Sequence, residues 1–250
     1  MHNFFVEKES RIGESYIIRG TDLNHIKNVL RMKVGEEILV SDNGISHLCS
    51  ISEYTEDAVI VSVVEENYND TELQTQIYLF QGMPKGDKLE LIIQKAVELG
   101  VYKIIPVEMA RSVVKIEDKK KKNKQERWQA ISESAAKQSK RNIIPEVTEP
   151  ISYKNAMAMA KDLDVFAVPY ENEDGMKATA ACMGKMKNTK TVGILIGPEG
   201  GFDQTEIELA KQVGGEIISL GKRILRAETA AITAVGAVML YLEMNGEVNG

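Results

Sequence analysis

Residues 191–210, TVGILIGPEGGFDQTEIELA, decide the fold that the sequence predicts. The run Thr191–Ile196 is apolar and ends in turn residues, which is typical of a buried strand. Asp203 follows the glycine-rich loop, and Glu206 comes three residues later, a spacing typical of a capping box at the start of a helix. The stretch therefore predicts a strand, a loop and a helix in succession, the unit from which parallel α/β sheets are built.

The same alternation of strands and helices continues on both sides of this stretch. Because ligands bind at the carboxyl ends of the strands in such sheets, the loops after the strands are the first places to look for chemistry. We expect further strands at 76–81, 102–108, 164–168 and 216–220, and further helices at 87–99, 124–139 and 228–244.

The first seventy residues have a different pattern. Short strand-like runs alternate with turn signals, and one helical patch interrupts them, with Asp22 as its expected N-cap. The segment 65–75 is polar without a helical or strand period, so it is the expected linker. The sequence therefore predicts a small β-rich domain over residues 1–70 and an α/β domain over residues 74–250.

Composition excludes several classes of protein. The two cysteines, Cys49 and Cys182, are far apart and predict neither a metal site nor a disulfide framework. The N-terminus lacks the apolar run of a signal peptide, and the longest apolar stretch, Ala230–Leu242, is shorter than the roughly 20 residues of a membrane span. We expect a soluble cytoplasmic protein with no membrane partner.

Net charge is −6, but the charge is unevenly distributed. Residues 111–141 contain 11 basic and 4 acidic residues, a local net charge of +7. A basic segment on an acidic body is typical of a surface that binds phosphates. A solvated lysine-rich helix explains the same composition, and charge alone leaves both interpretations open.

Two loops at strand ends carry the candidate chemistry. The first, Gly197–Phe202, lacks the motif of a phosphate-binding loop and places Glu199 where it would repel an anion. Its ligand should be neutral or cationic, and S-adenosylmethionine, with a sulfonium charge and no phosphate, meets that condition. A tight turn into the next helix is the structural alternative.

The second loop, Leu220–Arg226, places Lys222, Arg223 and Arg226 before an apolar helix that begins near Glu228. Arginines at the carboxyl end of a strand favour a functional role. Glu228 has a structural explanation as well, because an acidic residue at a helix start is favoured by the helix dipole.

Several blocks, in order along nearly the whole chain, are similar to the RsmE-type methyltransferases of the SPOUT superfamily. These blocks are HIKNVLRMKVGEEI, KGDKLELIIQKAVELGVYKIIPV, ARSVVK, RWQAISESAAKQSKRNIIPEV, GPEGGF and LGKRILRAETAA. The resemblance implies a PUA-like β-barrel that binds RNA, followed by a SPOUT domain with a deep trefoil knot and a homodimer formed through that domain. It also implies S-adenosylmethionine-dependent methylation of N3 of a uridine in 16S rRNA of the small ribosomal subunit.

The resemblance also assigns residues. Arg226 is the expected stabiliser of the uracil anion, and Glu228 or Glu199 the expected proton acceptor, with a solvent route equally open. RNA binding is assigned to His25, Arg31, Arg111, Lys115 and Arg141. Cofactor binding is assigned to Leu195, Ile196, Gly197, Gly200, Leu220, Gly221, Ile224, Leu225 and Arg226.

Other interpretations remain open at this point. A SPOUT enzyme acting on a ribose 2′-hydroxyl or another base has a similar pattern, and so does a non-catalytic RNA-binding assembly factor. The small residues of the final helix fit either a dimer interface or the core of one subunit. Lys95 and Glu98 are predicted to form a surface pair one helical turn apart.

Overall fold

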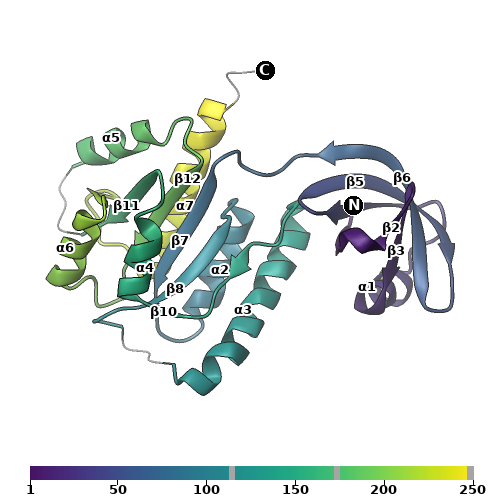
Figure 1. Ribbon diagram of the computed structural model, residues 1–250, viewed down its shortest axis with the longest axis horizontal. Coiled ribbons are helices and arrows are strands. Elements are labelled where there is room, and N and C mark those ends of the chain that lie inside the picture. The colour runs from purple at the N-terminus through teal and green to yellow at the C-terminus, as the bar shows by residue number, and fades with distance from the viewer. Residues whose placement is uncertain (113–115, 172–174, 247–250) are drawn as a thin grey trace. The chain divides into compact units, whose positions relative to one another are not determined.

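The computed structural model describes residues 1–112, 116–171 and 175–246, which form two compact units (Figure 1). Unit 1 comprises Met1–Glu72 and Ala136–Ile144, and unit 2 comprises Leu73–Ala135 and Pro145–Gly250. The predicted domains, 1–70 and 74–250, differ from these units mainly in the segment 136–144, which returns to unit 1. Hydrophobic periodicity reports only local structure, so it could not show that residues 136–144 pack with unit 1.

Unit 1 is built on a curled six-stranded sheet. Its strand order is β1-β4-β5-β6-β3-β2, with β1 and β4 parallel and the other described pairs antiparallel. Its core is a single cluster of buried apolar side chains that includes Tyr16, Ile26, Ile38 and Val59. The strands are β1 (Asn3–Val6), β2 (Arg11–Ile12), β3 (Ser15–Arg19), β4 (Glu37–Asp42), β5 (Ile45–Tyr54) and β6 (Ala58–Asn69).

The expected linker at 65–75 is wrong in its first half. Strand β6 continues through Asn69, because its polar end still pairs with β5. Antiparallel sheets can expose one face to water, where polar residues are common, so polarity alone does not end a strand. The three short helices of unit 1 are η1 (Lys8–Ser10), α1 (Gly20–Asn24) and the π-helical turn η2 (His25–Val29).

The predicted N-cap at Asp22 is also wrong. Helix α1 starts at Gly20, two residues earlier, and the Asp22 side chain accepts a hydrogen bond from Lys137 at 3.0 Å instead of capping the helix. The prediction relied on a polar residue, Asp22, that precedes apolar residues at helical spacing. Local spacing does not reveal that Lys137, 115 residues away, binds the Asp22 carboxylate.

Unit 2 contains a sheet whose described strand pairs are all parallel. Its order is β10-β8-β7-β12-β11-β13, with β9 also paired to β8. The strand predicted at Thr191–Ile196 is confirmed as β12, next to β7 near the middle of the sheet. The strands are β7 (Gln76–Gly82), β8 (Lys103–Glu108), β9 (Glu146–Val147), β10 (Ile151–Ser152), β11 (Val165–Pro169), β12 (Thr191–Ile196) and β13 (Glu216–Ile218).

Helices cover both faces of this sheet (Figure 1). On one face, α4 and α6 pack in a cluster with Phe80 and Leu195. On the other face, α7 packs against α2, β7 and β12. The helices are α2 (Lys88–Glu98), α3 (Asp118–Ser139), α4 (Tyr153–Ala160), α5 (Lys177–Lys185), α6 (Gln204–Gln212) and α7 (Ala227–Gly246).

Among the described residues, α7 is the one helix that is long and apolar enough to cross a membrane, and about a third of its apolar stretch is buried. The prediction from the sequence considered only the uninterrupted apolar run Ala230–Leu242, which is shorter than α7. Its residues Ala231, Ala234, Val235 and Val238 recur on one side and are buried, as in a helix that covers a sheet.

Candidate functional site

The loop after β12 is packed closely against two other segments of unit 2. A side chain at Gly82 would place its Cβ 2.7 Å from the backbone nitrogen of Pro198, and one at Gly200 would place it 2.9 Å from the carbonyl oxygen of Arg111. Gly201 has φ +69°, in the region that favours glycine, and donates to the Pro198 carbonyl oxygen at 2.9 Å. The glycines therefore permit close backbone approach, and a plain tight turn does not account for all of them.

The end of this loop is fixed by the predicted capping box, which is confirmed. Asp203 accepts from the Thr205 amide, and Glu206 accepts from the Asp203 amide at 2.9 Å. Glu206 also accepts from the amide of Ala110 at 2.8 Å, which ties the segment after β8 to the start of α6.

Glu199, in the middle of the loop, is bound rather than free. Its carboxylate accepts from the Lys85 amide at 3.1 and 3.3 Å and from Lys88 Nζ at 2.8 Å. Burial favours a higher pKa, but these hydrogen bonds and the Lys88 charge outweigh it, so the pKa of Glu199 lies below its ordinary value. The expectation that its charge repels anions needs correction, because Lys88 compensates that charge.

Lys88 also approaches Glu228, and so joins both candidate loops. Its Nζ lies 3.7 Å from Glu228 Oε2, in the first turn of α7. The hydrogen bond to Glu199 raises the pKa of Lys88, and the positive charge of Arg226 opposes this rise. Glu199, Glu228 and Arg226 thus gather around one lysine that the sequence analysis missed.

The loop after β13 approaches the site through Arg226 and Glu228. Gly221 has φ +103°, and Thr179 holds Ser219 through hydrogen bonds to its carbonyl oxygen and amide. The guanidinium of Arg226 is exposed and makes no hydrogen bond or ion pair with the described residues. It is therefore available to an incoming ligand.

The apolar cofactor candidates are not all in one place. Leu195 and Ile196 are buried at the end of β12, and Leu195 belongs to the core cluster beneath α4 and α6. Ile224 is 87% exposed, so it does not pack against them in this structure. An apolar hollow under α5 and α7 includes Leu220 but none of the other candidates.

The RNA-binding candidates differ in exposure. His25 and Arg31 of unit 1 are exposed, and Arg31 has φ +56°, an unusual conformation for arginine. Arg111 of unit 2 lies beside the Gly200 carbonyl oxygen and Asp203. Lys115 lies outside the described residues.

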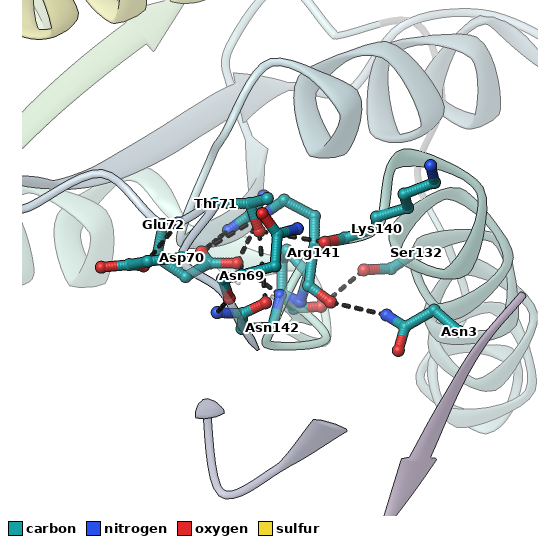
Figure 2. A network of polar contacts seen from close by, with 10 residues as sticks. Asn3, Asn69, Asp70, Thr71, Glu72, Ser132, Lys140, Arg141 and Asn142 are labelled. Atoms are coloured by element: carbon teal, nitrogen blue, oxygen red, sulfur yellow. Dashed lines mark hydrogen bonds and ion pairs between the residues drawn. The ribbon is translucent and has the colours of Figure 1, made fainter. Parts of the chain in front are cut away.

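Arg141 is buried in unit 1, with 3% of its surface exposed (Figure 2). Its guanidinium binds the Glu72 carboxylate through Nε at 2.9 Å and Nη2 at 2.5 Å, and the Asn142 amide donates to the same carboxylate. Asn3 donates to the Arg141 carbonyl oxygen at 2.9 Å. The geometry gives Arg141 a structural part in unit 1, and its predicted RNA contact stays a prediction.

The fold and this site define an RNA methyltransferase with a PUA domain. Residues 71–239 match the family model of the RNA methyltransferase domain, and residues 18–64 match that of the RNA methyltransferase PUA domain. The chain belongs to the ribosomal RNA small subunit methyltransferase E family. It is 38% identical to the Bacillus subtilis (strain 168) enzyme of that name, over 98% of both chains, and 36% identical to the Mesomycoplasma hyopneumoniae (strain 232) enzyme, over 93% of this chain and 96% of that one.

A solved structure of the Neisseria gonorrhoeae methyltransferase E bound to S-adenosylmethionine has a similar fold. It has a TM-score of 0.81 and 28% identity, and the alignment covers 96% of this chain and 97% of that one. A methyltransferase of Legionella pneumophila, also solved with S-adenosylmethionine, has a TM-score of 0.80 and 29% identity, with coverage of 95% and 96%.

One feature of the sequence could have indicated the role of Lys88. It is the first residue of α2, where the helix dipole disfavours a cation. A lysine at that position favours a carboxylate close to it in the fold, and the structure shows two, from Glu199 and Glu228.

Proposed function

We propose that this chain transfers the methyl group of S-adenosylmethionine to N3 of a uridine in 16S rRNA. Family membership supports rRNA methylation that uses this donor. The observation that carries the proposal is the convergence of Glu199, Glu228 and the unpaired Arg226 around Lys88, at the carboxyl ends of the strands. Ligands of parallel α/β sheets bind at such an edge.

The cofactor would be held by the two loops. Glycines at 197, 200 and 221 leave backbone groups accessible to a bound adenosine. Ile224 would have to move toward Leu195 and Ile196 to cover the adenine. The proposed cofactor residues are Leu195, Ile196, Gly197, Gly200, Leu220, Gly221, Ile224, Leu225 and Arg226.

The residues of the chain would supply acid–base and electrostatic help. S-Adenosylmethionine, when bound, supplies an electrophilic methyl group. Uracil N3 carries a hydrogen, so a proton must leave before or during attack, with Glu228 or Glu199 as acceptor. Arg226 would stabilise the negative charge that develops on the uracil. N3 is hydrogen-bonded in a base pair, so the target base would be unpaired or flipped out.

Contacts with the RNA would come from both units. The PUA unit would contribute His25, Arg31 and Arg141, and unit 2 would contribute Arg111 and Lys115. The trefoil knot and the homodimer through the SPOUT domain remain predictions, as does action in the cytoplasm on the small subunit.

The test is methyl transfer followed by nucleoside analysis. Small ribosomal subunits from a bacterial strain deleted for its own enzyme are incubated with this protein and labelled S-adenosylmethionine, and the nucleosides of 16S rRNA are identified by mass spectrometry. We expect labelled 3-methyluridine. A 2′-O-methylated nucleoside or another methylated base would refute the N3 assignment, and failure to bind the donor in calorimetry would indicate a non-catalytic RNA-binding factor.

Arg226→Ala isolates the electrostatic role in the same assay. We expect the methylation rate to fall about 10²–10³-fold, the usual loss when one transition-state donor is removed. Cofactor affinity should change much less, because charge on the base develops only during transfer. Full turnover by this variant would contradict the role.

A further inference from the structure

Lys88 is placed where the helix dipole disfavours it, and where two carboxylates reach it. It begins α2, Glu199 comes from the loop after β12, and Glu228 comes from the first turn of α7. The Nζ–oxygen distances are 2.8 Å to Glu199 and 3.7 Å to Glu228. One cation therefore joins three segments that are remote in sequence.

The two carboxylates have different surroundings. Glu199 receives donors at both oxygens, from the Lys85 amide and from Lys88 Nζ. A carboxylate with this many donors is fixed in position and is a poor proton acceptor.

The Glu228 carboxylate, by contrast, can still accept a hydrogen bond. Its Oε2 is fully buried and accepts no hydrogen bond, and its side chain is 16% exposed. A buried acceptor without a donor is costly, so the Glu228 carboxylate is stabilised by gaining a hydrogen. Lys88 Nζ, at 3.7 Å, is too far from Glu228 Oε2 for a strong hydrogen bond.

Two further charged groups lie near Lys88 besides Glu228: Glu199, and Arg226 in the loop before α7. From the sheet, β7 and β12 present the uncharged ends Gln81 and Ile196. Gln81 alternates with Phe80, which packs under α4 and α6, so Gln81 points to the face that α2 and α7 cover.

We propose that Lys88 is a positioning residue that holds Glu199 as a structural anchor and leaves Glu228 as the proton acceptor of methyl transfer. The inference rests on the proposed function. In the step, the N3–H bond breaks and its proton goes to the Glu228 carboxylate, whose side chain is partly exposed. The N3 electron pair forms the new bond to the methyl carbon, and the pair of the broken C–S bond stays on sulfur.

The test measures single-turnover methyl transfer to small subunits at saturating cofactor between about pH 5 and pH 9. Lys88→Met removes the cation that approaches both carboxylates. We expect the rate to fall at least about tenfold, and the acid limb of the pH profile to move to higher pH, because the site loses its nearest positive charge. Lys88→Arg keeps the positive charge, so the acid limb of its pH profile should lie close to that of the wild type.

The carboxylate variants separate the two roles. Glu228→Gln should lower the rate by about 10²–10⁴-fold and remove the acid limb. Glu199→Gln should raise the KM for S-adenosylmethionine without an upward shift of the limb.

The matched control is Lys95→Met. Lys95 lies on the same helix and pairs with Glu98 at 2.8 Å, as the sequence predicts, away from the site. We expect a wild-type profile from this variant. A wild-type rate and limb in Lys88→Met, or an unchanged acid limb in Glu228→Gln, would overturn the inference.

Nucleoside analysis of each product keeps this inference apart from the proposed function. If the product is 3-methyluridine and the Lys88 variants behave as wild type, the inference fails and the function stands. If another nucleoside is methylated and the Lys88 and Glu228 effects persist, the uridine N3 assignment fails and the positioning role stands for that reaction.

Discussion

Gly82→Ala is the perturbation that tests the packing of the candidate site most directly. The new Cβ would lie 2.7 Å from Pro198 N, Pro198 Cδ and Met109 Sδ. Ordinary contacts between carbon atoms are about 3.5–4.0 Å, so the overlap is roughly 1 Å. The Met109 side chain can rotate away, but the Pro198 nitrogen is backbone. The loop at 197–202 must therefore move.

Overpacking of this kind costs about 1–3 kcal/mol. For a chain of this size each kcal/mol lowers the melting temperature by about 2–4 °C, so we expect a fall of roughly 2–12 °C. The effect on function should be larger, because a displacement of about 1 Å at a reacting centre costs about 10²-fold in rate.

The assays are thermal unfolding by circular dichroism, calorimetric titration with S-adenosylmethionine, and single-turnover methylation. The matched control is Gly184→Ala in α5, where a new Cβ meets nothing within 4 Å. That variant should be more stable by up to about 1 kcal/mol, because alanine is the better helix former, with unchanged activity. If Gly82→Ala melts and methylates as the wild type does, the close approach of Gly82 and Pro198 is not a requirement of the site.

Two further predictions concern charged groups. Arg141→Met should destabilise unit 1 by about 3–5 kcal/mol, because it leaves the Glu72 carboxylate without its buried partner, whereas Lys140→Met, at an exposed neighbour, should leave the melting temperature unchanged. A stable Arg141→Met that lost only RNA affinity in a filter-binding assay would instead support a direct RNA contact. Because the folded-state pKa of Glu199 is lowered, its stabilisation is present above its unfolded pKa and is lost as pH falls through the folded value. Acid unfolding curves should show this loss in the wild type and not in Glu199→Gln, and superimposable curves would contradict it.

Local pattern was enough to predict much of unit 2. Strand β12 coincides with the predicted Thr191–Ile196, and the Asp203–Glu206 capping box is present, because both depend on neighbours within a few residues. The expected helix at 87–99 matches α2 to within a residue at each end, for the same reason.

Long-range partners account for what the sequence could not predict. Composition placed Arg141 in a basic RNA-binding segment, but its partner Glu72 is 69 residues away, and the pair is buried. Strand β6 continues over a polar segment because β5 pairs with it. Lys88 was missed because both of its carboxylates are more than a hundred residues away. None of these contacts changes the local period that sequence analysis measures.

The placement of Glu199 bears on which ligand the site accepts. Phosphate groups bind where free amides at a helix N-terminus point at them. Beside the N-terminus of α2, the amide of Lys85 and the ammonium of Lys88 are already bound by the Glu199 carboxylate of the chain itself. The charges of four side chains at the site, Lys88, Arg226, Glu199 and Glu228, add up to zero. A phosphate-bearing cofactor would have to displace an internal carboxylate, whereas a sulfonium donor with no phosphate does not. The position that an anion would occupy beside α2 is thus already filled by the Glu199 carboxylate. This occupation favours S-adenosylmethionine over a phosphate-bearing cofactor more strongly than charge repulsion by a free glutamate would.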